Sequence, residues 1–397
     1  MSERQHIYKT RRTVRNKVMF RRLLSAVMII LAVVVFVLNL LTPDRTFSDK
    51  ENRTLAGRPE LSRETLADWS YPRDLTAWYQ DQFFGRDSWM SLKFRTEYAL
   101  GQREFNGIYT GKEGYLLAKP EEPDPEALRR TAEAVKGFAE RYPQAGMDML
   151  VVPDAASVLA DKLPGGVAAR DQAADIREVY QMLPEQTGKI DVAETLRSDT
   201  QEQVYYRTDH HWTSAGALAA FGAARQELQI PADGVTYTSY LVSDSFQGTL
   251  ASRSGDYRQR DRIQVYDPVG TDVIYVVNYP DEQKRSRSMF RSEMLEQKDQ
   301  YTVFFGGNHA LVEINTTAEN GRNLLVFKDS YANSFMQFLT PYYQSIIMVD
   351  PRYYYGDIGT VMNTYGITDV LFLYSADTLF TDTALADTLG AGTGTGE

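Results

Sequence analysis

An uncharged run of 19 residues, from Leu23 to Leu41, constrains this chain more than any other feature. Only Ser25 and Asn39 within it are polar. At about 1.5 Å of rise per residue, a helix of this length spans about one hydrocarbon core of a bilayer. The sequence therefore predicts one transmembrane helix at residues 23–41, with the larger part of the chain following it.

The residues before this run are strongly basic. Residues 1–22 hold eight Lys or Arg and one acid, a charge of +7. The positive-inside rule predicts that this leader is cytoplasmic and that the body after Thr42 is extracellular. A cleaved signal peptide is the alternative, but its apolar region normally has about 7–15 residues, and no small-x-small cleavage site follows Leu41. We therefore expect an uncleaved, single-pass anchor in the cell membrane.

Charge and cysteine content exclude several classes of function. The total charge of −10 leaves −17 on residues 23–397, because the leader carries +7. An acidic body argues against nucleic acid as a partner, since phosphates require a basic surface. The absence of cysteine excludes disulfides, thiolate metal sites and a cysteine nucleophile.

Residues 42–104 form a segment with its own composition, between the apolar run and the body. A connector with Pro43, Gly57 and Pro59 leads into aromatic-rich residues with roughly helical spacing. Three of the four tryptophans fall here, at positions 69, 78 and 89. These rings either pack against the body or contact the membrane surface or a membrane partner.

The body, residues 105–381, alternates strand-length apolar runs with helical patterns. The runs are 147–152, 190–192, 301–305, 323–327, 345–349 and 370–374, with a hairpin expected at 106–117. Helices are expected at 125–142, 171–183, 213–228, 331–339 and 354–365. This alternation predicts an α/β fold with a largely parallel sheet and helices on both faces. Residues 231–300 are predicted to be an insertion with a short strand at 273–278, and residues 382–397 a disordered Gly/Thr-rich tail.

Imidazole chemistry in the body depends on three histidines, since His6 lies in the leader. His210 and His211 are adjacent, after Asp209 and before Trp212. In an extended backbone, Asp209 and His211 share one face and His210 points the other way. A carboxylate beside a histidine fixes its tautomer and raises its basicity, as a general base requires. The alternative is that Thr208 or Asp209 only caps the helix that begins near Thr213.

A second informative pair, Asp329 and Ser330, follows the apolar strand that ends at Phe327. Ligands of such sheets bind beyond the carboxyl ends of the strands. A serine placed there, before a helix whose free N–H groups favour negative charge, suits a nucleophile that generates an oxyanion. The alternative is that either residue is only a helix cap.

Residues 206–212 are similar to the signature of the DHHW family of bacterial proteins. That family resembles a branch of the SGNH-hydrolase-like proteins of polysaccharide O-acetylation, typified by the alginate acetylation proteins. Residues 51–55, 83–87 and 106–115 also resemble the front part of those proteins. Two departures are present: Lys328 stands where many SGNH enzymes have the glycine of Gly-Asp-Ser, and the usual Asp- and His-containing block near the C-terminus is absent.

The resemblance implies an SGNH-hydrolase-like fold, with Ser330 as nucleophile, His211 as general base and Asp209 as the residue that orients it. It implies a membrane-anchored, extracytoplasmic serine O-acetyltransferase or acetylesterase that acts on a surface polysaccharide through an acetyl-serine. No cofactor or metal is expected. A transferase needs an acetyl donor outside the cell, and the related systems imply a multi-pass membrane acyltransferase as partner.

The oxyanion and substrate contacts have several candidates. The backbone N–H of Ser330 is the first, and the glycines of residues 305–309 permit close backbone approach. Gly307 and the side chain of Asn308 are therefore candidates, with His210 and Trp212 as neighbours of the base. His309 receives no catalytic role.

Two other functions remain open from the sequence. One is a metal-dependent hydrolase with Asp209, His210, His211 and His309 as ligands, since zinc commonly takes histidine and carboxylate. Sensitivity to chelators would distinguish it. The other is a non-catalytic protein that binds glycan or scaffolds a cell-surface polysaccharide assembly, which would bind sugar without turnover.

Overall fold

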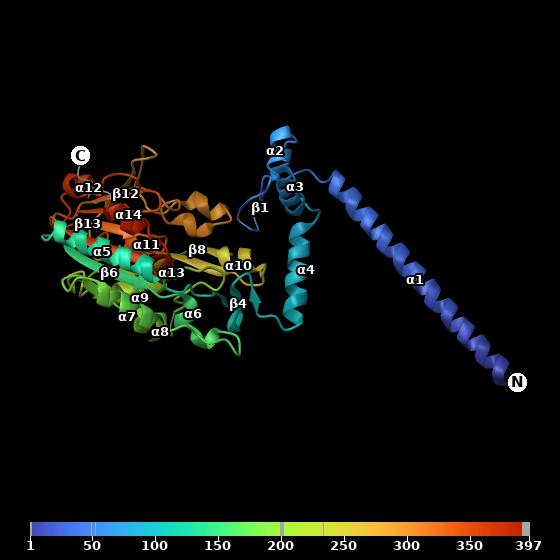
Figure 1. The fold of residues 1–397 in the computed structure, drawn as a ribbon. Coiled ribbons are helices and arrows are strands. Elements are labelled where there is room, and N and C mark those ends of the chain that lie inside the picture. The colour runs from blue at the N-terminus through green and yellow to red at the C-terminus, as the bar shows by residue number, and fades with distance from the viewer. Residues whose placement is uncertain (1, 49, 52, 199–201, 233, 391–397) are drawn as a thin grey trace. The chain divides into compact units, whose positions relative to one another are not determined.

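The computed structural model describes residues 2–48, 50–51, 53–198, 202–232 and 234–390, with side chains described from Asn16 onward. The chain forms two compact units, Met1–Lys93 and Phe94–Glu397. Figure 1 shows both as a ribbon, coloured along the chain.

The first unit begins with the long helix α1 (Ser2–Leu41). Its stretch Asn16–Leu41 is long and apolar enough to cross a membrane and has no buried part, so the predicted N-terminal apolar helix is confirmed. The other elements of this unit are β1 (Phe47–Ser48), β2 (Arg53–Thr54), α2 (Arg63–Ala67), α3 (Ser70–Asp81) and most of α4 (Arg86–Ala99).

Hydrogen bonds join the end of α1 and the residues after it to α3 and to the turn between α3 and α4. The Phe84 backbone N–H donates to Asn39 Oδ1 at 2.7 Å, and Trp78 Nε1 donates to Asp44 Oδ2 at 2.8 Å. The apolar helix is therefore tied directly to the aromatic-rich segment that follows it.

The second unit contains the remaining elements. Its helices are α5 (Pro125–Arg141), α6 (Ala155–Val158), α7 (Gln172–Met182), α8 (Ala193–Ser198), α9 (Ser214–Ala224), α10 (Thr249–Ser254), α11 (Ala332–Phe335), α12 (Ile358–Thr364), α13 (Ala376–Thr381) and α14 (Ala384–Gly390). Its 3-10 turns are η1 (Lys112–Gly114), η2 (Ala160–Lys162), η3 (Ser292–Glu296), η4 (Gln300–Val303) and η5 (Met336–Phe338). Its strands are β3 (Glu104–Phe105), β4 (Ile108–Thr110), β5 (Leu116–Ala118), β6 (Gly146–Val152), β7 (Gly188–Ile190), β8 (Thr236–Phe246), β9 (Asp261–Val269), β10 (Tyr275–Tyr279), β11 (Lys284–Ser286), β12 (Leu311–Thr316), β13 (Asn323–Lys328), β14 (Ser345–Val349) and β15 (Asp369–Ser375).

An eight-stranded sheet in the order β11-β10-β12-β14-β13-β15-β6-β7 forms the centre of this unit. The five strands from β14 to β7 are parallel, whereas β12, β10 and β11 add an antiparallel edge. The predicted α/β fold with a largely parallel sheet is therefore confirmed. Two smaller antiparallel sheets, β3-β4-β5 and β8-β9, lie outside it.

Alternating side chains of the central strands fill two cores, one on each face of the sheet. Leu324 and Val326 of β13 belong to one core, and Leu325 and Phe327 belong to the other. Helices α9 and α11 contribute to the first core, and α5, α7, α12, α13 and α14 contribute to the second. Burial on both faces explains why these strands are continuous apolar runs in the sequence.

Two expectations about secondary structure are wrong. Residues 301–305 are not a strand, because η4 occupies Gln300–Val303 and Phe305 then adopts φ +63°, followed by two glycines at positive φ. Residues 384–390 are not disordered, because they form α14 and bury Leu385 and Leu389 against the core that contains α5. The last seven residues of the predicted tail, 391–397, lie outside the described residues.

The region 231–300 contributes to the main sheet rather than only to its surroundings. Its strand β10 pairs with β12, and its strand β9 begins at the buried Asp261. The antiparallel edge of the sheet is therefore built partly from this region.

Two glycines of α9 provide a matched stability test. A Cβ at Gly216 would lie 2.2 Å from the backbone oxygen of Val204, whereas a Cβ at Gly222 would meet nothing within 4 Å. We predict that Gly216→Ala lowers the free energy of unfolding by about 2 kcal/mol or more, because backbone must move. Gly222→Ala should leave it unchanged or raise it by up to about 1 kcal/mol, since alanine favours helix.

Denaturant unfolding of both variants measures the difference. Equal stability of the two variants would contradict the close packing of α9 on the Val204 backbone.

Candidate active site

The Asp-His-His segment forms a tight loop rather than an extended strand. An antiparallel bridge between Tyr205 and Trp212 closes it, and the Thr213 N–H donates to Val204 O at 2.9 Å. The buried Asp261 at the start of β9 accepts hydrogen bonds from the Arg207 and Thr208 backbone N–H groups, at 2.9 and 2.7 Å. Region 231–300 therefore fixes the backbone of this loop.

This loop corrects one expectation about the histidines. His210 does not point away from His211, because the turning backbone brings the two rings together at an angle of 36°, with centroids 3.9 Å apart. The capping alternative is also wrong. The N-cap of α9 is Thr213, whose side chain accepts from the Gly216 N–H at 3.1 Å.

Ser330 lies just beyond the carboxyl end of β13. The preceding Asp329 is buried and used structurally: its Oδ1 accepts from the Tyr331 N–H at 2.9 Å, and its Oδ2 accepts from the Ser375 N–H at 2.9 Å. These bonds join the ends of β13 and β15 and fix the backbone that carries the serine hydroxyl.

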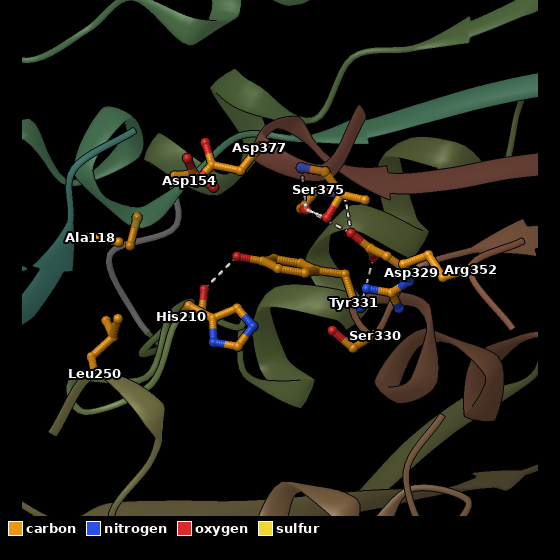
Figure 2. Close-up of a pocket in the computed structure, with 12 residues that line it drawn as sticks. Ala118, Asp154, His210, Leu250, Asp329, Ser330, Tyr331, Arg352, Ser375 and Asp377 are labelled. Atoms are coloured by element: carbon orange, nitrogen blue, oxygen red, sulfur yellow. Dashed lines mark hydrogen bonds between the residues drawn. The ribbon is translucent and has the colours of Figure 1, made fainter. Parts of the chain in front are cut away.

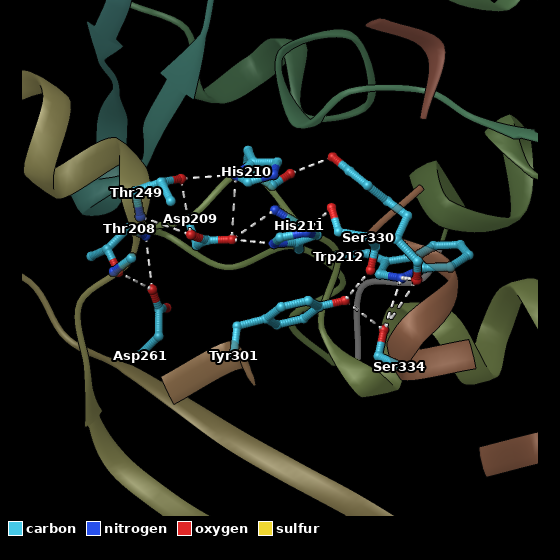
Figure 3. A network of polar contacts seen from close by, with 12 residues as sticks. Thr208, Asp209, His210, His211, Trp212, Thr249, Asp261, Tyr301, Ser330 and Ser334 are labelled. Carbon is cyan, nitrogen blue, oxygen red and sulfur yellow. Dashed lines mark hydrogen bonds and ion pairs between the residues drawn. The ribbon is translucent and has the colours of Figure 1, made fainter. Parts of the chain in front are cut away.

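The structure brings Ser330, His211 and Asp209 into one hydrogen-bonded chain (Figure 3). His211 Nε2 lies 2.8 Å from Ser330 Oγ, and His211 Nδ1 lies 2.6 Å from Asp209 Oδ1. Asp209 is 1% exposed and His211 is 5% exposed. A carboxylate acceptor at Nδ1 places the imidazole proton there and leaves the Nε2 lone pair facing the serine hydroxyl.

Two rings hold the imidazole of His211 in this orientation. The ring of Tyr301 stacks on it at 3.8 Å and 10°, and the ring of His210 lies close on it at 3.9 Å and 36°. The Tyr301 hydroxyl donates to the Ser330 carbonyl at 3.0 Å. Tyr301 therefore contacts both the histidine and the backbone of the serine.

The environment of Asp209 keeps it ionised. Burial alone raises its pKa, but His210, His211 and hydrogen bonds from His211 and Thr249 lower the pKa well below its usual value. Thr249 donates to Asp209 Oδ2 from both its N–H, at 2.8 Å, and its hydroxyl, at 3.0 Å. The carboxylate is thus held by groups on two segments.

A cavity of about 150 Å³ opens beside Ser330 (Figure 2). It is lined by residues that end or follow the parallel strands and by residues of β5, α10 and the Asp-His-His loop: Ala118, Asp154, Ala155, His210, Leu250, Asp329, Ser330, Tyr331, Arg352, Ser375, Asp377 and Thr378. The serine hydroxyl therefore faces a space that a small group can enter.

Charged residues form part of the wall of this cavity. Asp154 accepts from Gln172 Nε2 at 2.7 Å, and burial followed by the neighbouring Asp377 raises the pKa of Asp154 well above its usual value. Arg352 binds the fully buried Asp350 through two hydrogen bonds of 2.8 and 2.7 Å. The cavity thus offers both hydrogen-bond donors and acceptors.

The candidate oxyanion donors are not joined to Ser330 by hydrogen bonds as His211 is. Asn308 Oδ1 accepts from Lys328 Nζ at 3.0 Å and from Asn333 Nδ2 at 3.1 Å, which orients its amide. Gly307 has φ +113° in the turn before it. Among the described residues, neither Gly307 nor Asn308 forms a hydrogen bond with Ser330, and the Ser330 N–H has no hydrogen-bond acceptor.

Trp212 does not line the cavity, which corrects its prediction as a substrate contact. Its side chain is fully buried, and its Nε1 donates to Tyr331 O and Ser334 Oγ, both at 3.0 Å. It braces the segment after Ser330 instead. His309, which has no assigned role, contacts Phe305 O through Nε2 and Glu282 through Nδ1.

Asp209, His210 and His211 offer ligand atoms within 4.8 Å of one another, a spacing that a metal ion could use. However, both ring nitrogens of His211 already contact Asp209 and Ser330. Metal binding at this place would require breaking one of these bonds. The arrangement fits a base and its orienting carboxylate better than a set of metal ligands.

Several contributors were not identified in the sequence. Arg352 and Asp154 follow the buried strands β14 and β6. Their position after a strand could have identified them as residues near a ligand site. Thr249 lies in region 231–300, and Tyr301 directly follows it. Neither residue follows a buried strand, and both come close to His210 and His211 only in the folded protein.

The sequence from residue 128 to residue 349, more than half of the chain, matches the DHHW protein family. The chain belongs to the DHHW family. The resemblance noted at residues 206–212 is thereby confirmed. No protein with a curated description matches the chain.

Solved structures share this DHHW fold. A DHHW family protein from Eubacterium siraeum is 25% identical, with a TM-score of 0.61 over 72% of this chain and 96% of that protein. Bacillus cereus PatB1 with a sulfonyl adduct is 18% identical, with a TM-score of 0.59 over 70% of this chain and 97% of PatB1. PatB1 without the adduct gives a TM-score of 0.58 at 18% identity.

Gly248 tests the geometry around Asp209. A Cβ at this position would lie 2.2 Å from Asp209 Oδ2 and 2.3 Å from its Cβ. We predict that Gly248→Ala displaces the carboxylate and lowers the rate of any reaction at Ser330 by about a hundredfold, the usual effect of a misplacement near 1 Å. Gly137→Ala, whose Cβ would meet nothing within 4 Å, is the matched control. An unchanged rate in Gly248→Ala would contradict the placement of Asp209.

Lys328 provides a pH-dependent stability test. Burial lowers its pKa to about 8, although the nearby Asp350 opposes this effect. Between pH 8 and about 10.4 the unfolded chain binds more protons than the folded chain, so the free energy of unfolding should rise with pH. We predict a rise of up to about 3 kcal/mol relative to Lys328→Met, measured by denaturant unfolding at pH 7.5 and pH 10. Parallel pH profiles for the two proteins would contradict the lowered pKa of Lys328.

Proposed function

We propose that this DHHW protein is a serine acyltransferase or esterase in which Ser330 is the nucleophile, His211 the general base and Asp209 the residue that orients the base. The observation that carries the proposal is the hydrogen-bonded chain from Asp209 Oδ1 through His211 to Ser330 Oγ, with distances of 2.6 and 2.8 Å. The histidine and the serine are 119 positions apart in the chain.

The reaction proceeds through an acyl-enzyme. Ser330 Oγ attacks the acetyl carbonyl while its proton passes to His211 Nε2, and the leaving group departs with that proton. An acceptor hydroxyl, or water, then attacks the acetyl-serine, and its proton passes through His211 to Ser330 Oγ. Asp209 stabilises the imidazolium that forms in each step.

The Ser330 N–H is the first proposed donor to the oxyanion, because it has no acceptor among the described residues. Asn308 is the second proposed donor. Lys328 and Asn333 occupy its carbonyl oxygen, so its amide nitrogen is the group available to donate.

The proposed substrate is an acetylated or acetyl-accepting surface polysaccharide. This part of the proposal rests on the resemblance of the motifs to the polysaccharide O-acetylation proteins. A cavity that combines carboxyl groups, an imidazole and a guanidinium suits a molecule with many hydroxyl groups. The alternative is a non-catalytic glycan-binding protein. Binding of sugar without any turnover would favour that alternative.

We also propose that residues 23–41, within the apolar stretch Asn16–Leu41, anchor the protein in the membrane, with the basic leader of residues 1–22 in the cytoplasm and the body outside. The Asn39–Phe84 hydrogen bond then holds the aromatic-rich segment at the membrane surface. Tyr79, Phe83 and Trp89 line an apolar hollow in this segment. A multi-pass membrane acyltransferase that supplies acetyl groups is the proposed partner.

The test uses the full-length protein in detergent. We predict release of acetate from 4-nitrophenyl acetate, accumulation of an acetyl group on Ser330 by intact-mass and peptide mass spectrometry, and loss of about a thousandfold or more in rate for Ser330→Ala. The circular dichroism spectrum should be unchanged in that variant. Activity retained by a folded Ser330→Ala protein would exclude the serine mechanism.

A further inference from the structure

His210 is a second imidazole at the same cavity as Ser330, and the hydrogen-bonded chain of the proposed function does not use it. Its side chain is 39% exposed, in contrast to the buried His211. Figure 2 shows its ring on the wall of the cavity that Ser330 also lines.

The carboxylate of Asp209 is hydrogen-bonded to His211 directly and to His210 through the Thr249 hydroxyl (Figure 3). Its Oδ1 binds His211 Nδ1, whereas its Oδ2 accepts from the Thr249 hydroxyl at 3.0 Å. The oxygen of that hydroxyl lies 2.8 Å from His210 Nδ1. Because the single hydroxyl hydrogen goes to the carboxylate, the oxygen accepts from the Nδ1–H of His210.

This relay fixes the tautomer of His210. The hydrogen is on Nδ1, so the lone pair is on Nε2, which has no hydrogen-bond partner in the part of the chain that the structure describes. Partial burial of the ring, followed by the neighbouring His211, lowers the pKa of His210 and favours the neutral ring at pH 7. The Tyr331 hydroxyl donates to the His210 carbonyl and holds its backbone.

We propose that His210 Nε2 accepts a hydrogen bond from a second hydroxyl of the acceptor, next to the hydroxyl that attacks the acetyl-serine. The inference rests on the proposed function and narrows its acceptor to vicinal diols, which sugar rings provide. Thr249 is the positioning residue for His210.

The proton balance involves His211 alone. The attacking oxygen forms its bond to the acetyl carbon and its proton passes to His211 Nε2. The bond between Ser330 Oγ and that carbon then breaks, and Oγ takes the proton. His210 gains and loses no proton, because it only accepts a hydrogen bond from the neighbouring hydroxyl.

The experiment measures how the acetyl-enzyme of the full-length protein divides between acceptors. 4-Nitrophenyl acetate forms the acetyl-enzyme, and 1,2-propanediol, 1-propanol and water compete for it. We expect the diol to be acetylated about five- to tenfold faster than the mono-alcohol at equal concentration, the usual effect of one neutral hydrogen bond. This ratio does not depend on the rate of acylation, since all products come from one intermediate.

His210→Phe keeps a planar ring but has no acceptor atom, and it should remove the preference for the diol. Thr249→Val should reduce the preference because it frees the tautomer, and Thr249→Ser should retain it. Equal rates for diol and mono-alcohol in the natural protein, or an unchanged preference in both His210→Phe and Thr249→Val, would overturn the inference. Failure of the proposed function would give a different result from failure of this inference, because no acetyl-enzyme would form on Ser330 at all.

Discussion

The buried carboxylate of Asp209 is the group on which the rest of the site depends. It is 1% exposed, and its two oxygens hold His211 directly and His210 through Thr249. An unpaired buried carboxylate is costly, so each of these hydrogen bonds contributes to its ionised state as well as to the orientation of a ring. The close approach of Gly248, where any Cβ would overlap the carboxylate, shows how tightly this group is enclosed.

Sheet topology explains why residues far apart in the chain meet beside this carboxylate. The strands β6, β13, β14 and β15 are parallel, so the residues after each strand lie along one edge of the sheet. Asp154, Ser330, Arg352 and Asp377 reach the cavity in this way. The loop of residues 207–211 comes from outside the sheet. Asp261 fixes its backbone, and Trp212 joins it to the segment that carries Ser330.

Burial determines how much of this arrangement could be predicted from the sequence. The strands at 323–327, 345–349 and 370–374 are apolar on both faces, so their position and direction followed from composition alone. Residues 301–305 form a similar run, yet Gln300–Val303 adopt a 3-10 turn in which the ring of Tyr301 stacks on His211, a contact made between distant parts of the chain. The sequence placed the Asp209 and His211 side chains together on one face of an extended strand. They do lie together, but a tight loop and not an extended strand brings them there. Thr249 could not be found, because only the fold places it beside Asp209.

The most direct test of the central claim is covalent labelling of the full-length protein with phenylmethanesulfonyl fluoride, with the modified residue located by peptide mass spectrometry. Only an activated hydroxyl reacts readily, because the base must take its proton as the sulfur–oxygen bond forms. The account predicts a sulfonyl group on Ser330, formed at least about a hundredfold more slowly in His211→Gln. Labelling of a different serine, or equal labelling of Ser330 with and without the imidazole of His211, would contradict it.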